Sequence, residues 1–259
     1  MRPPVILLPP SEGKATGGHG PPWQAAGGAF AALGDERRRV RDAVRAVLAG
    51  GGDAPGRLLG ARGPHLERAL EGWRRLDEAP TLPAAARYSG VVWGALGPAD
   101  LGRAARRRLE ERVLVPSGLW GLVAAGDPLP DYRLRMGARV PPLGALAAFW
   151  RPRVSALVAG RAAGGWIIDL LPREHAAALD RAALGDRLLR VEIVEDGPDG
   201  RRLTGHGGKA LKGRLARALL ERDARDPAAI ARLRVPGLRA DRRASDLDGP
   251  APTLVLRRA

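Results

Sequence analysis

The chain has 259 residues, 45% hydrophobic and 27% charged, a composition typical of a globular protein. Its formal net charge of +15 favours polyanionic partners such as DNA, RNA or nucleotides. The absence of cysteine excludes disulfides, zinc–thiolate sites, iron–sulfur clusters and a cysteine nucleophile. No apolar run reaches the roughly 18 residues of a membrane span, and the apolar stretch Val5–Leu8 is too short for a secretory signal. We therefore expect a cytoplasmic protein without membrane contact.

Hydrophobic periodicity predicts strands and helices in the first half of the chain. A short buried strand is followed by a glycine-rich loop, two amphipathic helices and a third helix whose N-cap is Asp100. In chain order, these elements are a strand at Val5–Leu8, a loop at Ser11–Pro22, and helices at Asp35–Leu48, at His65–Leu76 and from Asp100 through Arg112.

The second half mixes strands and helices in the same way. We expect Pro152 to break, kink or restart the helix that contains it. The predicted elements are a strand with a turn at Val113–Val123, a helix at Ala145–Val158, a strand at Trp166–Leu171, a helix at Pro172–Leu179, a strand at Leu189–Val194, turns within Glu195–Gly200, a helix at Lys209–Arg222, a loop at Ala240–Pro252 and a strand at Thr253–Leu256. Since neither an internal repeat nor a long linker interrupts them, we predict one compact mixed α/β (α+β) domain over residues 1–259, and we expect a monomer.

The loop after the first strand contains Ser11, Glu12 and Lys14. It is not a P-loop, because the first glycine of that motif is missing and Ala15 follows the lysine. Backbone amides and an ammonium group at the end of a buried strand can nevertheless meet a phosphate or a carboxylate. The alternative is an exposed turn with incidental charges.

The basic residues are almost all arginine, and only Lys14, Lys209 and Lys212 are lysines. A lysine kept in such a chain indicates a position where a compact ammonium is needed. Lys209 and Lys212 share one helix face just after a glycine-rich loop, and Arg214 extends the basic surface. A helix N-terminus with these charges would attract a phosphate. The alternative is a solvated helix face.

Asp169 lies late in an apolar strand, where a carboxylate must find partners. It either caps the following helix or orients a lysine or a substrate, and Glu174 follows it nearby. The segment Asp131–Gly137, which includes Arg133 and Arg135, alternates charge with apolar bulk as a strand would. No histidine pair has helical metal-ligand spacing, so we predict no metal and no cofactor.

Several of these segments together resemble the peroxide-stress protein YaaA family. The resemblance runs nearly end to end, and its most specific part is S-G-L-W-G followed by Y-R-L-R-M-G. The matching segments are Leu8–Lys14, Tyr88–Val91, Pro116–Gly121, Asp131–Gly137, Phe149–Trp150, Ile167–Leu170 and Lys209–Gly213. The first loop is similar to the actinobacterial form of the motif.

This resemblance implies the single-domain cantaloupe fold and a cytosolic protein that limits free iron and DNA damage under peroxide. It also implies DNA binding through a basic cleft with a helix-hairpin-helix-like element. The chain departs from the family pattern where His175 replaces a tyrosine, where Lys209–Gly213 displaces one charge, and where Pro152 interrupts a helix.

Two main functions compete. The first is binding of double-stranded DNA with weak sequence specificity in the peroxide or oxidative stress response, with ligand contacts from Ser11, Lys14, Arg133, Arg135, Lys209, Lys212 and Arg214. The second is an enzyme acting on a nucleobase, nucleotide or small anion, with Glu12, Lys14, Asp169, Glu174 and Lys209 as candidate catalytic residues. The second predicts that Lys14 and Lys209 lie within about 10 Å in one deep pocket. Direct iron ligation is a weaker third possibility.

Overall fold

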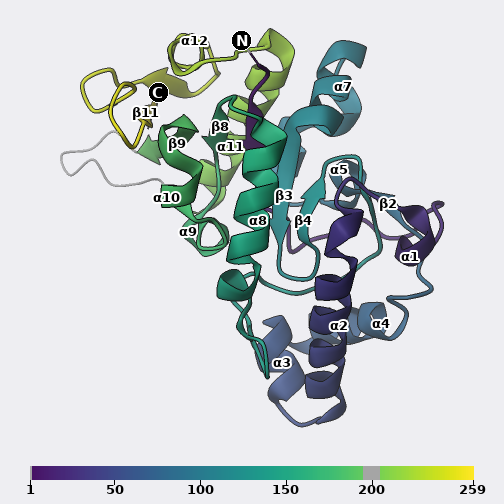
Figure 1. The fold of residues 1–259 in the computed structure, drawn as a ribbon. Helices are drawn as coiled ribbons and strands as arrows, with labels where there is room; N and C mark the ends of the chain where they lie inside the picture. The colour runs from purple at the N-terminus through teal and green to yellow at the C-terminus, as the bar shows by residue number, and fades with distance from the viewer. Residues whose placement is uncertain (1, 195–204) are drawn as a thin grey trace.

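The computed structural model describes residues 2–194 and 205–259, and a seven-stranded sheet forms its centre (Figure 1). The strand order is β10-β11-β9-β8-β1-β3-β4. Strands from β11 to β3 pair in parallel, whereas β10 and β4 pair antiparallel at the two edges. The strands are β1 Val5–Leu7, β3 Val113–Ser117, β4 Gly121–Ala124, β8 Ile167–Asp169, β9 Leu188–Val194, β10 Leu238–Ala240 and β11 Thr253–Arg258.

The central strand β1 is buried along its whole length, between β8 and β3. An unbroken apolar run is what a parallel strand covered on both faces requires. The mixed α/β class and the strand predicted at Val5–Leu8 are therefore confirmed.

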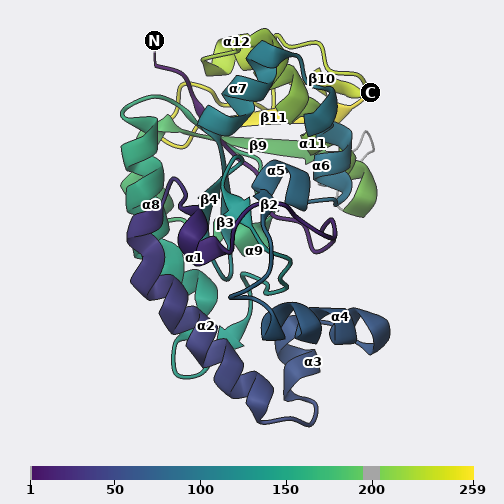
Figure 2. The same ribbon diagram turned by 90° about the vertical axis from the view of Figure 1, so that its right-hand side faces the viewer.

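Helices pack on both faces of the sheet (Figure 2). Helix α8 (Leu146–Ala162) and the short α10 (Arg181–Leu184) cover one face. Helices α6 (Val91–Leu96), α7 (Arg103–Arg112) and α11 (Gly205–Arg222) cover the other. None of the helices described is long and apolar enough to cross a membrane.

Helix α11 lies directly against α6 at Gly213. A Cβ at this position would overlap the carbonyl oxygen of Val92 and would come within 2.8 Å of the Ala95 Cβ. One turn later, Arg217 donates from Nη1 to the Leu96 carbonyl at 3.2 Å and from Nη2 to the Asp100 carbonyl at 3.2 Å. The contacts advance along both helices together, so α11 and α6 run parallel.

Three helices extend the molecule at the end opposite α7 and α12 (Figures 1 and 2). They are α2 (Gly34–Ala49), α3 (Ala54–Leu59) and α4 (Gly63–Arg74). The buried Arg37 of α2 donates to the carbonyls of Trp120 at 3.1 Å and Leu122 at 3.0 Å, which fixes the helix to the β3–β4 hairpin.

The remaining elements are short. They are α1 Trp23–Ala26, α5 Ala84–Arg87, α9 Arg173–Ala176, α12 Pro227–Ala231, the pairs β2 Leu82–Pro83 with β5 Pro128–Leu129 and β6 Arg139–Val140 with β7 Gly144–Ala145, and 3₁₀ turns at Ala31–Leu33, Pro98–Asp100 and Gly185–Arg187.

Two predictions about the limits of helices are wrong, one of them only in part. Asp100 does not cap α7, because it belongs to a 3₁₀ turn and Gly102 is the N-cap residue. Helix α8 is neither broken nor restarted at Pro152 but continues to Ala162, with six of its residues buried in the core, whereas a kink at Pro152 stays a prediction. Packing of a long apolar face outweighs the one hydrogen bond that a proline removes.

Three further segments differ from the sequence prediction. Asp131–Gly137 alternates in burial but pairs with no strand in the described part of the chain. The helix expected from Pro172 to Leu179 is the single turn α9. Helix α11 begins at Gly205, so Lys209 lies in its second turn. The glycines at 205, 207 and 208, expected in a loop before Lys209, belong to the helix. The turns predicted within residues 195–200 lie outside the described residues.

Candidate functional site

The loop after β1 is tied to the start of α6. Ser11 Oγ accepts hydrogen bonds from the amides of Ser89 at 3.2 Å and Gly90 at 3.0 Å, and it donates to the Gly13 carbonyl. A Cβ at Gly90 would lie 2.7 Å from that of Ser11, so this approach needs a glycine. Lys14 forms an antiparallel bridge with Tyr88. The loop is thus a bound strap at the carboxyl end of a central strand, where α/β sheets commonly place ligands.

Lys14 is buried under this strap, with 7% of its surface exposed. Its Nζ donates to the Ser11 carbonyl at 2.9 Å and lies 4.3 Å from the ring centre of Tyr132 and 5.7 Å from that of Tyr88. Burial lowers the pKa of Lys14 from 10.5 to about 7, although the neighbouring carboxylate of Asp131 opposes the shift. Near neutral pH the amine is therefore in part uncharged and able to accept a proton or act as a nucleophile.

A chain of three hydroxyl groups lies beside this amine. Tyr132 Oη is 2.8 Å from Ser117 Oγ and 2.9 Å from Tyr88 Oη. Burial raises the pKa of Tyr132 to about 12 and raises that of Tyr88 as well, so both phenols keep their protons at neutral pH. The sequence contains only two tyrosines, and both meet here.

Two carboxylate–arginine pairs hold the strap from outside. Arg68 of α4 donates to Asp131 Oδ2 from Nε at 3.0 Å and from Nη2 at 2.7 Å, and Nη2 also reaches the Lys14 carbonyl at 2.7 Å. Arg133 donates to Glu12 Oε2 at 2.7 Å and to the carbonyl of Gly60 at 3.1 Å. These contacts fix the α3–α4 region against the candidate site.

The loop after β8 joins the same region. Burial lowers the pKa of both Lys14 and His175, and the nearby carboxylate of Glu12 opposes the shift in each. The buried Nδ1 of His175 has no hydrogen-bond partner among the described groups. Glu174 accepts a hydrogen bond from the Gly137 amide at 2.9 Å. The structure thus brings together the predicted residues Glu12, Lys14, Arg133 and Glu174, and it adds His175.

Asp169 and Lys212 support the end of β8. Asp169 is 2% exposed and accepts from Arg181 Nη2 at 2.7 Å and from the Leu171 amide at 2.9 Å, so it does not cap α9. Burial raises its pKa against the nearby charges of Arg181 and Lys212. Lys212 Nζ donates to the carbonyls of Leu170 at 2.8 Å and Leu171 at 3.3 Å. Both side chains therefore brace the loop that carries Glu174.

The other predicted residues lie further out. Lys209 is exposed, and the parallel register of α11 and α6 places its backbone level with the start of α6, where Ser11 is bound. The distance between the ammonium groups of Lys14 and Lys209 stays a prediction. Arg214 lies against the turn before β10, 3.5 Å from the Pro236 carbonyl, and Arg135 lies against Gly60.

Comparison with known proteins now decides the family. The family model described as peroxide stress protein YaaA matches residues 5–244. A UPF0246 protein of Streptomyces coelicolor is 35% identical over 221 residues, covering 83% of this chain and 82% of the relative. A UPF0246 protein of Corynebacterium glutamicum is 32% identical over 219 residues, covering 83% and 84%. The chain belongs to the YaaA family of peroxide stress proteins.

The sequence does not single out several supports of this YaaA-family site. Arg68 and Arg181 belong to no motif. Ser117 and the two tyrosines stand in the matching segments without a predicted role, although the rarity of tyrosine is as informative as that of lysine. Within the described residues, no group of three or more metal-ligating side chains occurs.

Proposed function

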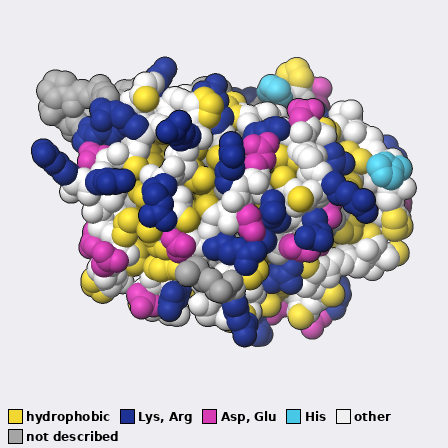
Figure 3. Space-filling view, turned by 90° about the horizontal axis from the view of Figure 1, so that it is seen from above, with side chains coloured by type: hydrophobic (Ala, Val, Ile, Leu, Met, Phe, Trp, Pro, Cys, Tyr) yellow, Lys and Arg dark blue, Asp and Glu magenta, His cyan; other side chains and the backbone are white. Residues whose placement is uncertain are grey.

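We propose that this YaaA-family protein acts under peroxide stress by binding double-stranded DNA. The contact is the connection between α6 and α7 (residues 97–102, called the α6–α7 hairpin below) together with the start of α7. Family membership supports the stress role, and a net charge of +15 supports a polyanionic partner. Lys and Arg side chains are spread over the face seen in Figure 3, with acidic side chains between them. Such a surface favours weakly sequence-specific contacts to phosphates.

The observation that carries this proposal is the start of α7. Its N-cap residue Gly102 has no side chain, and no described group accepts from the first-turn amides of Arg103, Ala104 and Ala105. These residues line a hollow of about 370 Å³ together with Arg108 and Glu221. Free amides at a helix N-terminus beside an exposed arginine are a site for a phosphate.

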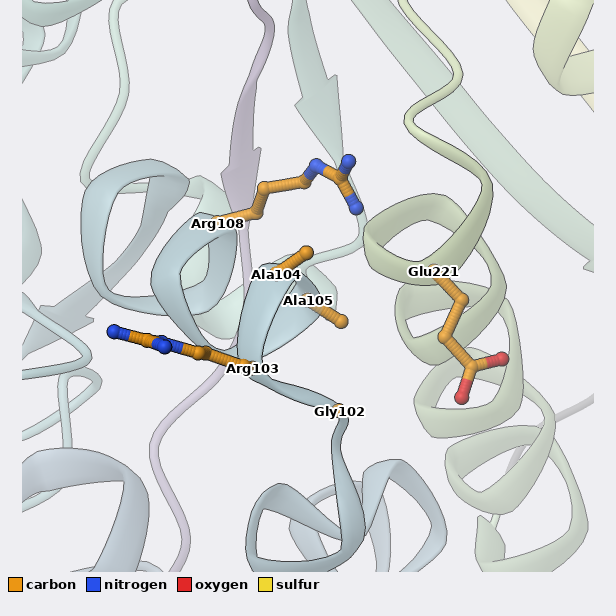
Figure 4. A pocket seen from close by; sticks show the side chains of 6 residues that line it. All are labelled: Gly102, Arg103, Ala104, Ala105, Arg108 and Glu221. Atoms are coloured by element: carbon orange, nitrogen blue, oxygen red, sulfur yellow. The ribbon is translucent and has the colours of Figure 1, made fainter.

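Glu221 is the unfavourable element of this hollow. Figure 4 shows it on α11, across from the small side chains Ala104 and Ala105, while Arg103 points away from it. Its carboxylate lies 2.8 Å from Arg217 Nε, which offsets part of the negative charge. Removing the charge should therefore strengthen the binding of a phosphate backbone.

Fluorescence anisotropy with a labelled duplex tests this proposal. We expect log K to fall with log salt with a slope of about −0.9 for each phosphate contacted. Arg107 is exposed on α7 one turn after Arg103, and the double variant Arg103→Ala, Arg107→Ala should weaken binding about tenfold or more and make the slope shallower. Glu221→Gln should strengthen binding. Arg74→Ala, on the exposed surface of α4 at the other end of the molecule, is the control for a change in charge.

Two results would contradict the proposal. One is no binding of the duplex at about 50 mM salt, where phosphate contacts are strong. The other is equal weakening, per charge removed, by the α7 variant and by Arg74→Ala, which would show that only total charge matters.

The burial of Lys14 favours a second candidate, an enzyme acting on a nucleobase, nucleotide or small anion. A lysine in part uncharged at neutral pH, beside protonated phenols and the carboxylate of Glu12, suits proton transfer or attack on an electrophilic carbon. Incubation with nucleobases and nucleotides, followed by mass spectrometry, should show turnover that Lys14→Met abolishes and Lys209→Met does not. Turnover that survives Lys14→Met, or none with any compound, would count against this candidate.

A further inference from the structure

A second hollow, of about 330 Å³, lies between α2, α3 and the segment that leads into β6. Its volume falls within the range of small-molecule sites, about 300–1,000 Å³. Three arginines line it together with apolar side chains, Arg57 from α3 and Arg135 and Arg139 from the stretch that leads into β6, with Val47, Ala54, Leu58 and Ala138. Leu58 and Ala138 are each 6% exposed and provide a buried apolar wall.

The positive charge of this hollow is only weakly offset. Asp53 lies 3.4 Å from Arg57, but both side chains are largely exposed, so the pair is strongly screened. Within the described residues, no carboxylate forms an ion pair with Arg135 or Arg139. The carboxylate of Glu174 accepts a hydrogen bond from the lining residue Gly137, so it opposes part of the charge of the three arginines.

Arg135 is an exposed side chain that rests on the neighbouring backbone. The guanidinium of Arg135 packs on the backbone of Gly60, where a Cβ would lie 2.7 Å from Nε. Gly60 has φ +57, a left-handed conformation that also favours glycine. The backbone of Arg135 is closely packed as well, since a Cβ at Gly118 would lie 2.8 Å from the Arg135 carbonyl oxygen. A side chain that already rests on a packing partner loses less entropy on binding a ligand than one that has none.

We infer that this hollow binds a small molecule that carries a phosphomonoester on an apolar, planar body. Three guanidinium groups provide more donors than one carboxylate can use, and their planar forks match the oxygens of a phosphate. The apolar wall of Leu58 and Ala138 makes no favourable contact with inorganic phosphate, but it can pack against a ring that is attached to the phosphate.

The hollow is linked to the Lys14 site through one side chain. Arg133 bonds both to Glu12 and to the carbonyl of Gly60, which directly follows the lining helix α3. It is separate from the proposed DNA contact, since α3 and α7 lie at opposite ends of the molecule (Figures 1 and 2). The inference therefore does not depend on DNA binding.

Titration calorimetry with adenosine 5′-monophosphate as the probe tests the inference. The nucleotide should bind at least about tenfold more tightly than adenosine or inorganic phosphate, because each offers only half of the contacts. Arg135→Ala and Arg139→Ala should each weaken it about tenfold. Arg74→Ala removes an equal charge from the surface of α4 and should change the affinity less than about twofold.

The outcomes separate this inference from the proposed function. If Arg135→Ala weakens nucleotide binding while the Arg135→Ala and Arg74→Ala variants bind the DNA duplex with equal affinity, the result supports a separate small-molecule site. Failure of the nucleotide to bind, or equal binding to the wild type and Arg135→Ala, overturns the inference whatever the DNA result. Loss of duplex binding in the α7 variant with nucleotide binding intact concerns the DNA proposal alone.

Discussion

The buried amine of Lys14 should make the stability of the fold depend on pH. In the folded chain its pKa is about 7, against 10.5 for a free lysine side chain. Between these values the unfolded chain holds a proton that the folded chain has released, so the free energy of unfolding rises with pH. At 1.36 kcal/mol per unit, the full difference is about 5 kcal/mol. Below about pH 7 the folded chain must bury the ammonium group itself.

The Lys14→Met variant isolates this contribution, because methionine has a similar length and no charge. Other titrating groups cancel when the stability of the variant is subtracted from that of the wild type. Between about pH 6 and about pH 9.5 the wild type should gain about 3 kcal/mol relative to the variant, since the unfolded chain is still mostly protonated at the upper limit. Tyr132, with a pKa of about 12, does not titrate in this window.

Urea denaturation at a series of pH values measures the difference. Lys209→Met, at an exposed position, is the matched control and should give a flat difference across the same range. The ¹³Cε signals of the three lysines give an independent reading, and that of Lys14 should titrate with a midpoint near 7. A Lys14→Met difference that changes by less than about 0.5 kcal/mol would refute the reasoning, because it would mean that the amine is solvated in the folded chain.

Other predictions test the packing around the site by urea denaturation at constant pH. Gly213→Ala should lower stability by about 1–3 kcal/mol, because its methyl group overlaps the Val92 carbonyl, against the gain in helix propensity; no loss would show that α6 can move. Tyr132→Phe should cost about 1–2 kcal/mol by leaving buried hydroxyls unpaired. Asp169→Ala should cost about 1–3 kcal/mol, since it removes the acceptor for Arg181 and a buried amide; a neutral effect would assign the support of this loop to Lys212.

The sequence predicted helices best where one amphipathic stripe faces the core. The helix predicted at Asp35–Leu48 is α2, with bounds Gly34–Ala49. The prediction of helix limits from the sequence failed where tertiary packing, rather than local propensity, decides where a helix begins and ends. A proline or a run of glycines lowers helix propensity locally, but α8 and α11 continue through such residues because their neighbours supply the packing.

The scarcity of lysine in this sequence predicted the residue at the centre of the candidate site, but it did not predict the side chains that hold that residue in place. Lys14 stood out as one of three lysines in a chain rich in arginine, and it is the most deeply buried amine in the described structure. The same reasoning overstated Lys209, which is exposed. Pairs such as Arg68 with Asp131 join positions far apart in sequence, and no local pattern records which arginine of many will meet a given carboxylate.

The two proposed functions share one short helix. Helix α6 begins where Gly90 binds Ser11 of the Lys14 strap and ends at Gly97, which opens the hairpin before α7. Its six residues span about 9 Å, and Gly213 fixes its side against α11. A displacement at either end must therefore move the other or open the contact with α11, since a packed helix of two turns has little room to bend. Binding of DNA at the hairpin and of a ligand beside Lys14 should consequently influence each other, and a duplex affinity that is unchanged in Lys14→Met would show that the two ends of α6 act independently.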